Sequence, residues 1–133
     1  MIGLTQALFS YTSAKLLGLN EKFAVLGGLI PSVSMVLIYA GPLKYEGILL
    51  SFTSAIFFST IIFYSSGPEA GKGLFTGYSC SLLLESFTFS YLPVFYPFTG
   101  FQGLGLFSSF DPVWNLSIIS ACLLVLAGIK LKN

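Results

Sequence analysis

Long apolar runs separated by short polar breaks recur along the chain and predict helices that cross a membrane. A helix needs about 20 mostly apolar residues to span a bilayer, and the chain has room for four to five such segments. The runs are continuous and do not alternate with polar positions, which favours helices over strands. The predicted helices cover residues 4–19, 23–39, 46–64, 69–89 and 113–129. We therefore expect an all-α fold, a single integral membrane domain (residues 1–133) built as a polytopic transmembrane helix bundle.

Three local features modify this simple bundle. Pro31 falls inside the second predicted helix, where a proline removes a backbone hydrogen bond and leaves the helix kinked or broken. The segment 91–112 is rich in aromatic residues, glycine and proline, and tyrosine favours the membrane interface. We expect it to form a long aromatic loop packed against the bundle. Asp111-Pro112 has the residue order of a helix start, which fixes the beginning of the last helix.

Composition supports the assignment to a membrane. Hydrophobic residues make up 55% of the chain and charged residues 8%, whereas soluble domains carry about 25% charged residues. This difference excludes a water-exposed surface of ordinary size. The net charge of +1 gives no electrostatic basis for binding nucleic acid. The expected partners are membrane lipids and either other membrane protein subunits or further copies of this chain.

The placement of lysines predicts an orientation. In an arrangement of five passes, one side of the membrane receives Lys15, Lys22, Lys72, Lys130 and Lys132, and the other side receives Lys44. Positively charged loops face the cytoplasm, so the N-terminus is expected outside and the C-terminus in the cytoplasm of a prokaryotic or archaeal plasma membrane. If the polar first segment lies at the interface instead of spanning, only the C-terminal assignment holds.

The absence of histidine limits the chemistry that the chain can perform, because imidazole is the usual proton shuttle and a common metal ligand. No serine can be paired with a histidine base. The triplet Gly71-Lys72-Gly73 lacks the spacing of a phosphate-binding loop. The sequence therefore predicts no catalytic residue, no metal site and no cofactor.

Glu85 is the ionisable residue that stands out, because it lies inside an apolar run of the fourth predicted helix. A carboxylate within a membrane helix is energetically costly and is a candidate functional group by default. One interpretation is a neutral carboxyl that forms a hydrogen bond with Ser51, Ser81 or Gln6 on a facing helix. The other is a group that binds a proton or an ion.

Small residues gather in the first half of the same predicted helix. They are Ala70, Gly71, Gly73, Gly77, Ser79, Cys80 and Ser81. In lipid, small residues let helix backbones approach closely, so this face is expected to be a packing seam and not a ligand site.

Five short segments resemble, in their order and spacing, a family of small membrane proteins. They are Thr5-Gln6, residues 28–34 (GLIPSVS), residues 45–51 (YEGILLS), residues 77–85 (GYSCSLLLE) and Tyr96-Pro97-Phe98. The chain resembles the membrane-bound metal-dependent hydrolases of the YdjM-like type, whose corresponding segments carry histidine and aspartate. The resemblance covers most of the apolar scaffold and implies a shared fold.

The departures from that family fall on its polar residues. Gln6, Ser32, Ser34, Tyr45, Leu50 and Ser81 stand where the family has histidine or aspartate, and Glu85 keeps a carboxylate. Catalytic zinc normally needs three protein ligands, so the resemblance implies a divergent, pseudoenzyme-like relative without its metal. The positions expected to line a residual polar cavity are Glu85, Ser81, Gln6, Ser32, Ser34 and Tyr45.

Three functions fit these observations. The preferred one is a non-catalytic integral membrane protein, an accessory subunit or oligomeric scaffold of a membrane complex. The second is a hydrolase-like or lipid-headgroup-binding protein that uses the residual cavity. The third is a small ion- or proton-coupled channel or transporter that uses Glu85, for which a helix broken at Pro31 would suit a site at mid-membrane.

Overall fold

The computed structural model describes residues 2–39, 50–88, 92–95, 99–101, 104–106, 108 and 111–132. Within them the chain forms five helices and one small antiparallel sheet. The helices are α1 (Ile2–Leu17), α2 (Glu21–Tyr39), α4 (Phe52–Ser66), α5 (Pro68–Thr88) and α6 (Pro112–Lys132), and the strands are β1 (Leu92–Phe95) and β2 (Thr99–Phe101). The expectation of a helical bundle is confirmed, and four of the five helices begin and end within three residues of the predicted bounds.

Two parts of the predicted outline need correction. The helix expected over 46–64 begins at Phe52, because Ser51 caps it by accepting a hydrogen bond from the Ser54 amide at 3.3 Å. Residues 46–49 lie outside the described part of the chain. The aromatic segment expected to be a loop contains the hairpin of β1 and β2, in which Leu92 pairs with Phe101.

Helix α2 is not broken at Pro31, since it continues to Tyr39. Hydroxyl groups supply hydrogen bonds to the carbonyls around the proline: Ser34 Oγ donates to Ile30 O at 2.8 Å, and Ser32 Oγ donates to Gly28 O at 3.3 Å.

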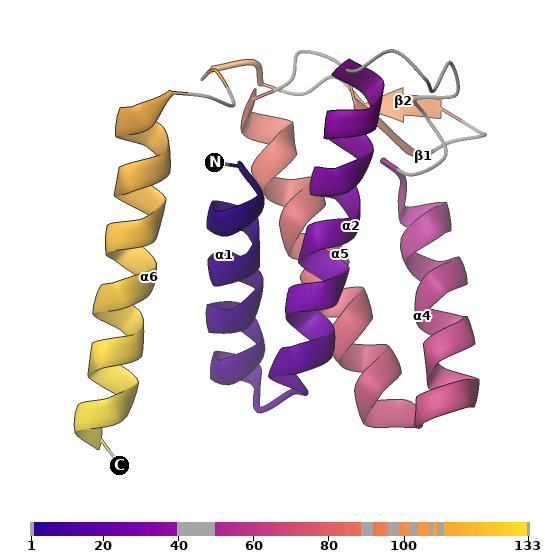
Figure 1. The fold of residues 1–133 in the computed structure, drawn as a ribbon, viewed down its shortest axis with the longest axis horizontal. Coiled ribbons are helices and arrows are strands. Elements are labelled where there is room, and N and C mark those ends of the chain that lie inside the picture. The colour runs from indigo at the N-terminus through magenta and orange to yellow at the C-terminus, as the bar shows by residue number, and fades with distance from the viewer. Residues whose placement is uncertain are drawn as a thin grey trace.

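Consecutive helices run up and down through the bundle, with α5 packed against α1, α2 and α4 (Figure 1). Helix α6 lies at one edge beside α1. The α1–α2 turn, the α4–α5 turn and the C-terminal end of α6 all lie at one end of the bundle. Glu85 is near the other end, in the last turns of α5.

The small-residue face of α5 is a packing seam within this chain, as expected. A Cβ atom at Gly77 would overlap the backbone of Ala24 in α2, and one at Gly71 would lie 2.7 Å from Phe63 Cβ in α4. Because both glycines are needed for these close approaches, the seam is occupied by α2 and α4 and offers no surface to another protein.

Polar groups are concentrated inside the bundle. The buried polar side chains include Thr5, Gln6, Ser10, Ser32, Ser34, Ser51, Ser54, Ser81, Glu85 and Asn115. Large apolar side chains are exposed on the outside, including Leu26, Val33, Phe57, Ile61, Leu116 and Leu124. In a water-soluble protein, large aliphatic residues are the ones most often buried.

Among the described helices, α6 has the length and apolar composition needed to cross a membrane. Helix α4 is also apolar but has 15 residues, fewer than the roughly 17–25 of typical spanning helices. The structure therefore gives a helical bundle in which one described helix is both long and apolar enough to span, and the number of passes stays a prediction.

Candidate polar site at the junction of α1, α5 and α6

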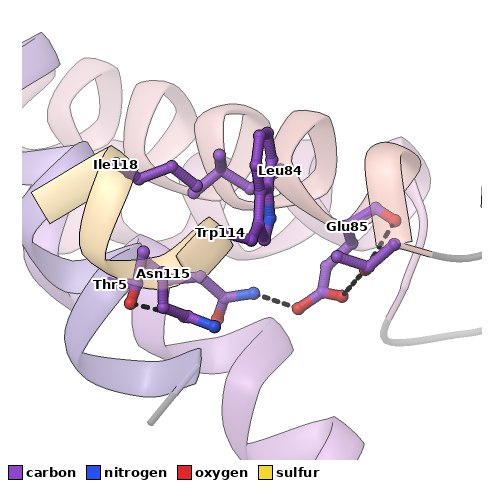
Figure 2. Close-up of a pocket in the computed structure, with 8 residues that line it drawn as sticks. Thr5, Leu84, Glu85, Trp114, Asn115 and Ile118 are labelled. Atoms are coloured by element: carbon purple, nitrogen blue, oxygen red, sulfur yellow. Dashed lines mark hydrogen bonds between the residues drawn. The ribbon is translucent and has the colours of Figure 1, made fainter. Parts of the chain in front are cut away.

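Glu85 is the centre of a buried polar cluster. Its side chain is 1% exposed, and that of Gln6 on α1 is 2% exposed. Gln6 Nε2 donates a hydrogen bond to Glu85 Oε1, and Thr88 Oγ1 lies 3.0 Å from Glu85 Oε2 (Figure 2). The contact with Gln6 is one of the three that the sequence suggested for this carboxyl, and it joins residues 79 positions apart.

The start of α6 brings a second polar pair to the same place. Asp111 caps the helix, because its Oδ1 accepts hydrogen bonds from the amides of Val113 (2.8 Å) and Trp114 (3.2 Å). The cap at Asp111 was predicted and is confirmed. One turn later, Asn115 Oδ1 accepts from Thr5 Oγ1 at 2.7 Å, and Asn115 Nδ2 donates to Asp111 O at 2.8 Å. This cap and pair position the first turn of α6 against α1.

These groups surround a small cavity of about 20 Å³. Its lining residues are Thr5, Gln6, Leu84, Glu85, Thr88, Trp114, Asn115 and Ile118. Figure 2 shows the side chains of Leu84, Trp114 and Ile118 on one side, with Thr5, Asn115 and Glu85 on the other. A cavity of this size holds about one water molecule. Gln6 Oε1 is buried and accepts no hydrogen bond from the described residues.

The other residues predicted for the cavity lie elsewhere. Ser81 is buried one turn before Glu85, but its Oγ donates to Gly28 O at 3.0 Å across the α2–α5 interface. Ser32 and Ser34 donate to carbonyls of their own helix. None of the three lines the cavity beside Glu85, because each hydroxyl has an acceptor close at hand in the backbone. Tyr45 lies outside the described residues.

Among the hydroxyl and amide residues that line the cavity, sequence reasoning missed three: Thr5, Thr88 and Asn115. Two signals could have found them. Thr88 is three positions after Glu85 and therefore shares its helix face. Asn115 is an amide in an otherwise apolar helix, and polar side chains within such helices usually face the bundle interior.

The chemistry open to this cluster is binding and hydrogen bonding. No group of three or more histidine, cysteine, aspartate or glutamate residues gathers anywhere in the described ranges. The polar groups of the cavity are one carboxyl, two amides and two hydroxyls, which offer oxygen atoms, and the indole N–H of Trp114. Oxygen atoms that accept hydrogen bonds or act as metal ligands suit a proton, a water molecule or a hard cation.

Comparison with known proteins adds no further assignment. No family model, no curated protein and no solved structure matches the chain.

Proposed function

We propose that this protein is a non-catalytic integral membrane protein that acts by association, as an accessory subunit or oligomeric scaffold of a membrane complex. The observation that carries the proposal is the outer side of α6. This helix packs against α1 on one side, while Val113 and Leu124 on the opposite side are 72% and 74% exposed. An apolar surface of this kind requires lipid or another helix to cover it.

The same outer side of α6 carries small residues that favour a helix partner over lipid alone. They are Ser117, Ser120, Ala121, Ala127 and Gly128, all exposed. A Cβ added at Gly128 would meet no atom within 4 Å. Small residues on an exposed face allow a second helix to approach closely in lipid. The small-residue seam of α5 is already filled by this chain, so α6 is the better candidate for a contact surface.

The inverted distribution of polarity supports a membrane as the setting of this function. Polar side chains such as Gln6, Ser81 and Glu85 are buried, and polar residues of membrane bundles usually face the interior. Within the proposal, the lysine-bearing end faces the cytoplasm of a plasma membrane, because Lys15, Lys72 and Lys130 lie near the turns and terminus that meet at that end.

We retain as part of the proposal a relationship to the membrane-bound metal-dependent hydrolases. Support comes from two positions that the resemblance places in one ligand set, Gln6 and Glu85, which form a hydrogen bond between α1 and α5. In the alternative function, the residual cavity would bind a lipid headgroup. The cavity of about 20 Å³ argues against that use, because it has room for about one water molecule.

Native mass spectrometry, together with cross-linking in the membrane, tests association through α6. The full chain is expressed in membranes, extracted in mild detergent and analysed for partners or higher oligomers by native mass spectrometry. We expect Gly128→Leu and Ser120→Leu to remove at least about nine-tenths of the associated species, because a bulky side chain separates the two helices.

Leu123→Phe is the matched control, since it enlarges a residue of α6 that is already bulky and exposed. We expect it to keep the wild-type assembly. Cross-linking in the membrane, before extraction, shows whether the chain has partners there. A chain that is monomeric and without partners in that experiment would refute the proposal. So would assembly that is unchanged in both small-to-large variants.

A further inference from the structure

The cavity beside Glu85 is built by three helices that are far apart in sequence. Thr5 and Gln6 come from α1, Glu85 from α5, and Asn115 from α6. All four side chains are at most 3% exposed. A polar group that is this deeply buried must be satisfied within the protein or by something bound there.

A negative charge on Glu85 has no compensating lysine among the described residues. Lys15 pairs with Glu21 and Lys72 with Glu69, at the other end of the bundle. Along α5, residues 72 and 85 are separated by about 20 Å at 1.5 Å per residue. Burying an unpaired carboxylate is costly, so the site needs one positive charge, brought by a bound ion or by a proton on Glu85.

Several hydrogen-bond donors around the cavity are directed at groups of the chain itself. Gln6 Nε2 donates to Glu85, Thr5 Oγ1 to Asn115, and Asn115 Nδ2 to Asp111. Gln6 Oε1, in contrast, is buried and has no partner among the described residues. A buried acceptor oxygen is therefore left over beside the carboxylate of Glu85. A bound cation would use this oxygen and the carboxylate together as ligands.

Size and charge select the kind of cation. The volume of about 20 Å³ fits about one water-sized particle, which is smaller than an ion with its full hydration shell. Magnesium usually keeps several of its waters. A divalent ion beside the single carboxylate of Glu85 would also leave an excess positive charge buried, whereas a monovalent ion makes the site neutral.

We propose that Glu85 and Gln6, with Thr5 and Asn115 completing the wall, form a binding site for one dehydrated monovalent cation, sodium. Glu85 supplies the charge and Gln6 Oε1 supplies a neutral ligand from the facing helix. The bound ion would join α1, α5 and α6 at one point. This inference does not depend on association through α6 and goes beyond it.

Thermal unfolding of the purified full chain in detergent tests the site, with sodium chloride compared with choline chloride at equal ionic strength. A ligand that binds only the folded state raises its stability with the logarithm of ligand concentration. We expect the unfolding midpoint to rise by several degrees between about 1 mM and about 100 mM sodium. Choline is too large for the cavity and should have no such effect.

Variants test whether the sodium-dependent rise of the unfolding midpoint comes from this cavity. Glu85→Gln should abolish the sodium dependence, and Gln6→Leu should shift it to sodium concentrations at least about tenfold higher. Ser86→Ala is the control on the same helix, because its hydroxyl donates to Leu83 O outside the cavity, and it should respond as the wild type does.

A wild-type midpoint that is equal in the two salts would overturn the proposal whatever the variants do. Equal midpoints combined with a strong dependence on pH would identify a proton on Glu85 as the occupant instead. A sodium effect that survives in Glu85→Gln would also overturn it, because the ion would then bind elsewhere.

Discussion

Gln6 and Glu85 act as a pair, and their coupling can be measured. Gln6 Nε2 donates to Glu85 Oε1, and both side chains are buried. Gln6→Leu leaves the carboxyl without that donor, and a buried polar group left unsatisfied costs about 1–3 kcal/mol. Glu85→Leu leaves the amide of Gln6 unsatisfied in the same way. We expect each single variant to lower the free energy of unfolding by about this amount.

The double variant Gln6→Leu/Glu85→Leu should lose less stability than the sum of the two single variants, with a coupling of about 0.5–3 kcal/mol. Denaturant unfolding in detergent provides the three free energies. Ser65→Ala on exposed α4 serves as a reference that should change little. Strict additivity of the two single variants would show that the contact contributes nothing to the folded state.

The residues of this site show which contacts could be predicted from the sequence and which could not. Glu85 was recognisable because a carboxyl in an apolar run is unusual, and Gln6 was among its possible partners. Asn115 was not recognised, because its role depends on Asp111 starting α6 where Thr5 of α1 can reach it. A contact that joins positions 110 apart follows from how the helices pack, which the apolar pattern does not specify.

At the scale of helices, the small residues of α5 control its distance from α2. Gly77 has no room for a Cβ atom, because the backbone of Ala24 occupies that space. Gly77→Ala should therefore force the two helices apart and lower the free energy of unfolding by about 1–3 kcal/mol, as overpacking of a filled interior does. Thermal or denaturant unfolding measures the loss.

Gly128→Ala in α6 is the matched control for Gly77→Ala. A Cβ atom at Gly128 meets nothing within 4 Å, and alanine favours a helix interior over glycine by about 0.5–1 kcal/mol. The control should be neutral or slightly stabilising. If Gly77→Ala behaved in the same way, α2 and α5 would not pack as closely as described.

The extent of the helices was predictable, because each apolar run is long and ends at a strong stop. Gly67 has a φ of 97° and is followed by Pro68 at the start of α5, and both residue types favour a turn. The hairpin of β1 and β2 was not predicted, since its segment contains Pro93 and glycines that favour loops. The proline was expected to leave the second helix kinked or broken, whereas α2 continues through Pro31 to Tyr39.

The lysines of the described helices are concentrated at one end of the bundle. The lysines of α1, α2, α5 and α6 lie close to the two turns and the C-terminus that share one end of the bundle, as the five-pass arrangement predicted. The N-terminus of the chain is near the other end (Figure 1). If the bundle spans a membrane, the two termini therefore lie on opposite sides of it, and the distribution of lysines decides which side is cytoplasmic.

Fusion reporters in a bacterial host test this orientation. We expect a green fluorescent protein fused after residue 133 to fluoresce and an alkaline phosphatase fused there to be inactive, because the lysine-bearing end faces the cytoplasm. Replacing Lys15, Lys22 and Lys72 by glutamine, together with the two lysines of the last turn of α6, leaves Lys44 on the other side and reverses the charge bias. That variant should shift the chain toward the opposite orientation. An active phosphatase on the unaltered chain would reverse the assignment, because the lysine-bearing end would then lie outside.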